Sequence, residues 1–121
     1  MTALLKEGQG WRIGWDEARN PFKALVGGEH WAMELTQQEF ESLQRLTQQL
    51  SATMAAMATE LMPDEQLTLE QETEQLWVEA EGFHHRYSLR FILLTGRGGE
   101  GGWPAEVVPD LLNGLERISV F

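Results

Sequence analysis

Apolar and polar side chains alternate along residues 76–93, which read LWVEAEGFHHRYSLRFIL. An alternation of period two predicts a strand with one buried face, and this segment contains two such runs. Gly82-Phe83 stands between them, and a glycine at that point predicts a tight hairpin turn. With these two residues at the centre of the turn, the hairpin places Glu79 opposite Arg86.

The first half of the chain carries a similar pattern. Residues 11–35 contain three alternating runs, and the last two lie on either side of Gly27-Gly28. The glycine pair predicts a hairpin in which Val26 faces Glu29, because both central residues of such a turn need a positive φ. The hairpin residues that we expect on the buried face are Phe22, Ala24, Trp31, Met33 and Leu35.

A long helix is predicted after the first hairpin. Thr36 and Glu39 have the spacing of a capping box, and Pro63 ends the helix at about Leu61. The apolar stripe of this helix consists of Phe40, Leu43, Leu50, Met54, Met57 and Leu61. We expect the stripe to pack across the sheet, while seven-residue spacings within it leave a coiled-coil seam open. A helix of this length, about 39 Å, can overhang the sheet and meet a partner.

The whole pattern indicates three strands and a helix, twice. Residues 67–72 alternate before the second hairpin, and Pro109 precedes leucines at the spacing of a short final helix. We therefore predict one domain over residues 1–121, with a first unit at 10–62 and a second at 66–119. The predicted fold class is α+β, with antiparallel sheets, one long helix and one short helix.

Negative charge is concentrated in the middle of the chain. Residues 36–82 contain ten acids against one base, Arg45, so this segment carries -9 of the net charge of -10. A surface this acidic repels phosphate backbones, and nucleic acid could bind only at a local basic face. Four of the acids would share one sheet face near Trp77, where we interpret them as solvated charges rather than a catalytic pair: Glu70, Glu72, Glu79 and Glu81.

Several classes of site are disfavoured by the residues present. The chain has no cysteine, which excludes disulfides, thiolate metal sites and cysteine nucleophiles. Adjacent strand residues such as His84 and His85 point to opposite faces, so we predict that they and His30 form no metal site. Gly96, Gly98 and Gly101 have the dinucleotide-binding spacing, but Trp103-Pro104 follows where a helix is required. We expect no cofactor, no catalytic residue and no enzymatic activity.

The start of the chain lacks the pattern of a signal peptide, and no stretch approaches the ~18 apolar residues of a membrane span. We therefore expect a cytoplasmic protein without a membrane partner.

Three segments together resemble a known family. They are Gly10-Trp11-Arg12-Ile13-Gly14-Trp15, the Gly27-Gly28 hairpin with His30 to Thr36, and Arg97 to Trp103-Pro104. This combination is similar to a family of small uncharacterised cyanobacterial proteins, whose fold resembles single-stranded-DNA-binding transcriptional regulators of the Whirly type. Lys23-Ala24-Leu25 matches part of a lysine-rich strand motif of Whirly proteins, but the neighbouring lysines are missing here.

Two functional hypotheses remain open, while a third, an enzyme acting on small molecules, has no set of residues to support it. The first is a non-catalytic interaction module that binds a protein partner or itself through the helix overhang or exposed tryptophans. The second is a weak single-stranded nucleic-acid binder, in which an indole stacks on a base and guanidinium groups contact phosphates. The residues proposed for a nucleic-acid or partner face are Arg12, Trp77, Arg86, Arg90 and Arg97.

Overall fold

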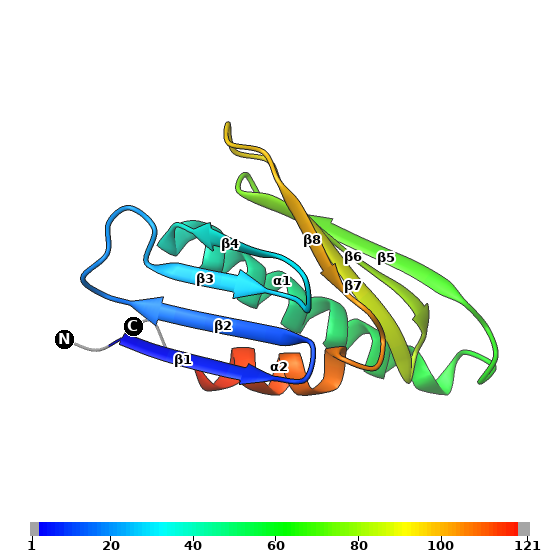
Figure 1. Ribbon diagram of the computed structural model, residues 1–121. Coiled ribbons are helices and arrows are strands. Elements are labelled where there is room, and N and C mark those ends of the chain that lie inside the picture. The colour runs from blue at the N-terminus through cyan, green and yellow to red at the C-terminus, as the bar shows by residue number, and fades with distance from the viewer. Residues whose placement is uncertain (1–2, 119–121) are drawn as a thin grey trace.

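Two antiparallel four-stranded sheets, each followed along the chain by a helix, make up the computed structural model, which describes residues 3–118 (Figure 1). The first sheet has the order β1-β2-β3-β4, with strands at Ala3–Gly8, Trp11–Asp16, Ala24–Gly27 and Ala32–Leu35. The second has the order β5-β6-β7-β8, with strands at Leu67–Glu72, Leu76–Phe83, Arg86–Leu93 and Glu100–Trp103. The helical segments are α1 (Gln37–Ala56), the short 3-10 helix η1 (Met57–Thr59) and α2 (Val108–Arg117). The predicted α+β class, with one long and one short helix, is confirmed.

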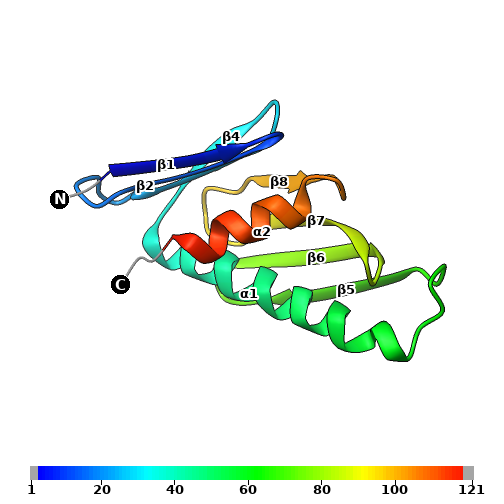
Figure 2. The same cartoon turned by 90° about the horizontal axis from the view of Figure 1, so that it is seen from below.

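The helices pack on the inner faces of the two sheets. Helix α1 contacts β5 and β6, while α2 contacts β1, β2 and α1. Figure 2 shows α2 between the first sheet and α1. Buried side chains from both sheets and both helices form one core cluster. Among residues 3–118, no helix combines the length and the apolar character needed to cross a bilayer.

Each sheet has a fourth strand that the sequence pattern does not predict. Strand β1 lies at an edge and contains the adjacent pair Leu4-Leu5 instead of a strict alternation, and Leu5 is 59% exposed. The first sheet therefore begins at Ala3, ahead of the predicted start at residue 10. Strand β8 lies in the glycine-rich segment, where the sequence pattern does not indicate a strand. A Cβ atom at Gly101 would lie 2.4 Å from the Trp31 ring. The strand can pass this close to the indole only because residue 101 is a glycine.

The predicted register of the first hairpin is wrong by four residues. Val26 pairs with Met33 instead of Glu29, and residues 28–31 form the loop. Neither Gly27 nor Gly28 has a positive φ. Space is the physical reason for glycine here, since a Cβ atom at Gly28 would lie 2.2 Å from Trp31 Nε1. A shift by an even number keeps the strand residues on their predicted face, where Ala24 and Leu35 are buried and Met33 is half-buried. Phe22 and Trp31 lie outside the two strands and are half-buried.

The second hairpin shows a shift of the same size. Glu79 lies opposite Arg90, not Arg86, and the turn consists of His84 and His85. Gly82 remains within strand β6, at a φ of 142°. The glycine therefore marks a special backbone conformation in the strand rather than the turn itself.

The capping box at the start of α1 is confirmed. The Glu39 amide donates to Thr36 Oγ1 (3.2 Å), and the Thr36 amide donates to the Glu39 carboxylate (2.9 Å). The α-helix ends at Ala56, earlier than the predicted Leu61, and continues briefly as η1. The stripe residues inside the helix are buried in the core: Phe40, Leu43, Leu50 and Met54. Their burial supports the prediction that the stripe packs across the sheet rather than forming a coiled-coil seam.

Helix α2 begins at Val108, next to the predicted Pro109. Its leucines Leu111 and Leu115 are fully buried. The short final helix is therefore confirmed.

Tryptophans join the two sheets. Trp31 Nε1 donates to the Gly102 carbonyl of β8 (3.3 Å), and Trp103 Nε1 donates to the Gly27 carbonyl of β3 (3.0 Å). The two indole rings lie 5.3 Å apart, with Phe91 packed against both. This reciprocal pair of hydrogen bonds, inside an aromatic cluster, connects sheets that share no strand.

Candidate interaction surfaces

The outward face of the second sheet is acidic. Alternate residues of its strands point away from the buried side, which holds Leu76, Val78 and Phe91. This acidic sheet face consists of Thr68, Glu70, Glu72, Trp77, Glu79, Glu81, Ser88, Arg90, Ile92 and Glu100. It carries five carboxylates against one guanidinium. The prediction that the four strand glutamates share a face with Trp77 is confirmed by the register.

Trp77 and Arg90 form the centre of the acidic sheet face. The Arg90 guanidinium carbon lies 4.9 Å from the Trp77 ring centroid, a cation–π arrangement. The same guanidinium is 3.5 Å from a Glu79 carboxylate oxygen and 3.9 Å from one of Glu100. Its positive charge is therefore shared with two carboxylates of its own sheet. Ile92 lies directly opposite Trp77 and extends the apolar surface.

Glu70 and Glu79 are directly opposite each other on β5 and β6. Like charges at this position destabilise a pair of strands. Glu79 has Arg90 as a partner, whereas Glu70 makes no ion pair with a described residue.

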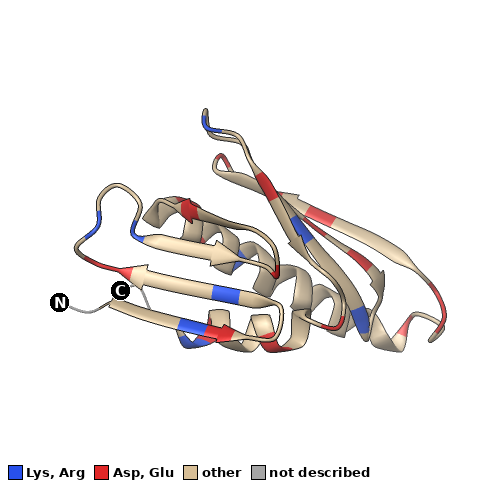
Figure 3. Ribbon diagram, viewed as in Figure 1, with Lys and Arg blue, Asp and Glu red and all other residues tan. Residues whose placement is uncertain are grey.

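The arginines predicted to form one basic face are distributed over the molecule. Arg12 is on β2 of the first sheet, and Arg86, at the start of β7, is 3.5 Å from Glu106. Arg97 lies in the loop after β7 and is ion-paired. Among the five residues of the predicted face, only Trp77 and Arg90 are in contact. Figure 3 shows the basic segments of the second sheet interspersed with acidic ones.

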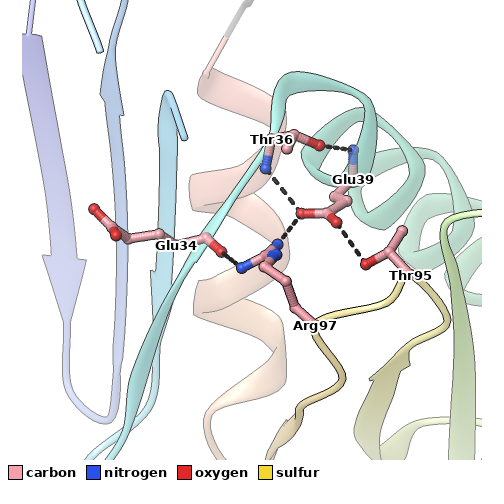
Figure 4. Close-up of polar contacts among 5 residues, drawn as sticks. All are labelled: Glu34, Thr36, Glu39, Thr95 and Arg97. Atoms are coloured by element: carbon pink, nitrogen blue, oxygen red, sulfur yellow. Dashed lines mark hydrogen bonds and ion pairs between the residues drawn. The ribbon is translucent and has the colours of Figure 1, made fainter. Parts of the chain in front are cut away.

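Arg97 belongs instead to a polar cluster around the buried Glu39 carboxylate (Figure 4). Its guanidinium donates to the Glu39 carboxylate and to the Glu34 carbonyl (2.9 Å). Thr95 Oγ1 donates to the other carboxylate oxygen of Glu39 (2.8 Å). Glu39 is only 2% exposed. We call Glu34, Thr36, Glu39, Thr95 and Arg97 the Glu39 cluster. In the sequence, only the capping box indicated this cluster. Its loop residues, Thr95 and Arg97, lie more than fifty residues after Glu39, so no local pattern connects them with it.

The three histidines occupy turns or loops. His30 is exposed in the β3–β4 loop, near Glu29. His84 and His85 are turn residues, so the strand alternation from which we expected opposite faces does not apply to them. Their ring centroids lie 4.8 Å apart. Within the described part of the chain, no three His, Asp or Glu side chains are grouped as a metal site.

The glycine motif at Gly96, Gly98 and Gly101 does not open a helix. Its chain returns as β8, antiparallel to β7, with Arg90 opposite Gly102. A dinucleotide fingerprint requires a strand–turn–helix context, which this segment does not provide.

Comparison with known proteins shows which family and which solved structure this chain resembles. The family described as "Domain of unknown function (DUF1818)" matches residues 6–118. The chain is also similar to a protein of unknown function from Prochlorococcus sp. NATL2A, described as from the DUF155 family, whose crystal structure is known. The two share 36% sequence identity and a TM-score of 0.88, over 93% of this chain and 96% of that one. No curated protein matches. Neither match names a Whirly-type regulator, so that resemblance stays a prediction.

Proposed function

Because this chain belongs to the DUF1818 family, a domain of unknown function, we propose a function from its surfaces: it is a non-catalytic module that binds a basic protein segment through the acidic sheet face. Trp77 and Ile92 would supply the apolar centre of the contact. The surrounding carboxylates would select a partner rich in lysine or arginine.

The unbalanced pair Glu70–Glu79 carries this proposal. Two carboxylates directly opposite on neighbouring strands cost stability in the free protein, and the acidic sheet face contains only Arg90 to offset them. A cationic side chain from a partner would remove this repulsion. Charge complementarity of this kind mainly adds specificity and speed of association.

Trp77 supports the same surface independently. Tryptophan is enriched among the residues that dominate binding energies in protein interfaces, especially at the centre of a contact. Here it is partly exposed, with Arg90 on its ring and Ile92 opposite it. An apolar centre with a polar rim is the usual anatomy of an interface.

The nucleic-acid hypothesis rests on the Whirly resemblance and uses the same Trp77 and Arg90. A phosphate approaching Arg90 would also meet Glu79 and Glu100, which already share its charge. The local geometry therefore favours a cationic partner over a polyanion.

A comparison of two charged probes tests the proposal. A short oligolysine peptide and a single-stranded oligothymidylate are each titrated into the protein at an ionic strength of about 0.01 M, where screening is weak. We expect heat of binding and a change in tryptophan fluorescence with oligolysine only. Binding of oligothymidylate without binding of oligolysine would overturn the proposal in favour of the alternative.

Paired variants localise the contact. The double variant Glu70→Gln/Glu79→Gln removes two charges from the acidic sheet face. Glu29→Gln/Glu60→Gln removes two exposed charges elsewhere and serves as the matched control. We expect the first pair to weaken oligolysine binding and the control pair to leave it nearly unchanged. Equal weakening by both pairs would mean that only the overall charge matters. Sedimentation of the free protein tests self-association. If the protein is a dimer and Trp77→Ala abolishes the dimer, the partner of the acidic sheet face is a second copy of the chain and not a basic segment.

A further inference from the structure

A cleft of about 530 Å³ lies on a different part of the molecule from the centre of the acidic sheet face. Three segments distant in sequence form its walls: the last turns of α1, the β6–β7 turn with the start of β7, and the beginning of α2. Small-molecule sites commonly have volumes of about 300 to 1,000 Å³. The cleft is therefore large enough for a compact organic ligand.

One wall of the cleft gathers hydrogen-bonding groups. His84, His85, Arg86 and Tyr87 are consecutive and all line it, and the ring centroids of the two histidines are 4.8 Å apart. These side chains present N–H and O–H donors. The net charge of the chain is -10, so this group of hydrogen-bond donors contrasts with the acidic character of the chain as a whole.

Tyr87 gives the strongest indication of a ligand. It is 9% exposed, and its hydroxyl has no hydrogen-bond partner among residues 3–118. No side-chain oxygen or nitrogen that is fully inaccessible in this part of the chain lacks a partner. Tyr87 lines the cleft, so a molecule bound there would lie against this residue. A polar group that is nearly buried and has no partner among residues 3–118 is expected to bond to a bound molecule or to water.

Apart from Ser51 and Glu106, the rest of the lining is apolar. Val108, Pro109 and Leu112 of α2 contribute to it, with Ala55 from the end of α1. This combination of an apolar wall and a few convergent polar groups is characteristic of small-molecule sites. It matches a ligand with an apolar body and one polar end.

We propose that this cleft binds a small organic carboxylate with an apolar body. The carboxylate would accept hydrogen bonds from Arg86 and the Tyr87 hydroxyl, beside the two histidines, while the body would lie on Val108 and Leu112. Glu106 also lines the cleft, with a carboxylate oxygen 3.5 Å from the Arg86 guanidinium, and both side chains are more than half exposed. An exposed ion pair of this kind is weak, so a ligand carboxylate can take the place of Glu106 at the guanidinium. Planar guanidinium groups match carboxylates well.

Matched probes test the ligand class. The amide signals of the protein are followed by NMR during titration with 2-naphthoate, with hexanoate as a slimmer acid, and with neutral 2-naphthylmethanol. We expect saturable shifts centred on residues 84–87 and 108–112 with an acid, and at least about tenfold weaker binding of the alcohol, as expected for a hydrogen bond to a charged group.

Variants test the assigned residues. Arg86→Gln is expected to weaken acid binding about tenfold, and Tyr87→Phe, which keeps the ring, about threefold to tenfold. Arg12→Gln removes the same charge from the first sheet and is expected to leave the affinity unchanged. Dispersed amide spectra of each variant confirm that it is folded.

Three results would overturn the proposal. They are the absence of shifts with both acids at concentrations on the order of 10 mM, equal affinity for acid and alcohol, and equal effects of Arg86→Gln and Arg12→Gln. Binding of oligolysine at the acidic sheet face is measured separately, so failure of one proposal leaves the other in place.

Discussion

At the scale of single residues, Glu17 makes the stability of the protein depend on pH. Its carboxylate accepts hydrogen bonds from Lys23 Nζ (3.0 Å) and Trp15 Nε1 (3.0 Å). The Lys23 bond first, and then the Trp15 bond, lower the pKa of Glu17 below its ordinary value. A lowered folded-state pKa stabilises the fold at neutral pH, and this contribution is lost as pH falls through that pKa. We expect Glu17→Gln to lack this acid-dependent loss, measured by urea denaturation across a pH series. An NMR titration in which the Glu17 pKa is not lowered relative to a model peptide would contradict the assignment.

At the scale of elements, the β5–β6 pair contains a repulsion that substitution can remove. Glu70 faces Glu79, whereas Glu72 faces Trp77. We expect Glu70→Gln to raise the free energy of unfolding by about 0.2 to 1 kcal/mol, because it leaves one carboxylate in place of an opposed pair. Glu72→Gln removes the same charge without relieving such a pair and is the control. Urea denaturation at low and high salt measures both variants, and the gain at Glu70 should shrink as salt screens the repulsion. A larger gain at Glu72 would show that net charge, not pairing, sets the stability.

At the scale of the whole molecule, the Glu39 cluster connects the start of α1 with the loop between β7 and β8 (Figure 4). Arg97→Ala would leave the buried Glu39 carboxylate without its cation. We expect a loss of about 2 to 3 kcal/mol in the free energy of unfolding, since a buried charged group loses a hydrogen-bonding partner. Arg45→Ala, at an exposed position of α1, should change it by less than about 0.5 kcal/mol.

A double-mutant cycle isolates this connection. In the background of Glu39→Gln, which removes the buried charge, Arg97→Ala should cost clearly less than it does in the native protein. An unchanged cost in both backgrounds would show that Arg97 stabilises the fold through its other contacts and not through Glu39. Those contacts are the Glu34 carbonyl and the Phe22 ring, whose centroid lies 4.4 Å from the guanidinium carbon.

Local patterns were sufficient for the two helices and for every strand except β1 and β8. The alternation of residues 76–93, the capping box at Thr36 and Glu39, and the helix stripe each depend on neighbours a few residues apart, so the sequence alone determined strand, helix and buried side. The placement of Trp77 among the strand glutamates follows from the same parity.

Contacts between distant residues decided what local patterns could not. The glycines at 28 and 101 are required by the Trp31 ring, which the sequence does not place beside them, and this contact sets the hairpin loop and admits β8. Arg97 pairs with Glu39 and does not join a basic face, and both turn histidines line one cleft. Register, edge strands and the partners of each charge depend on which segments pack together in three dimensions, and this packing was visible only in the tertiary structure.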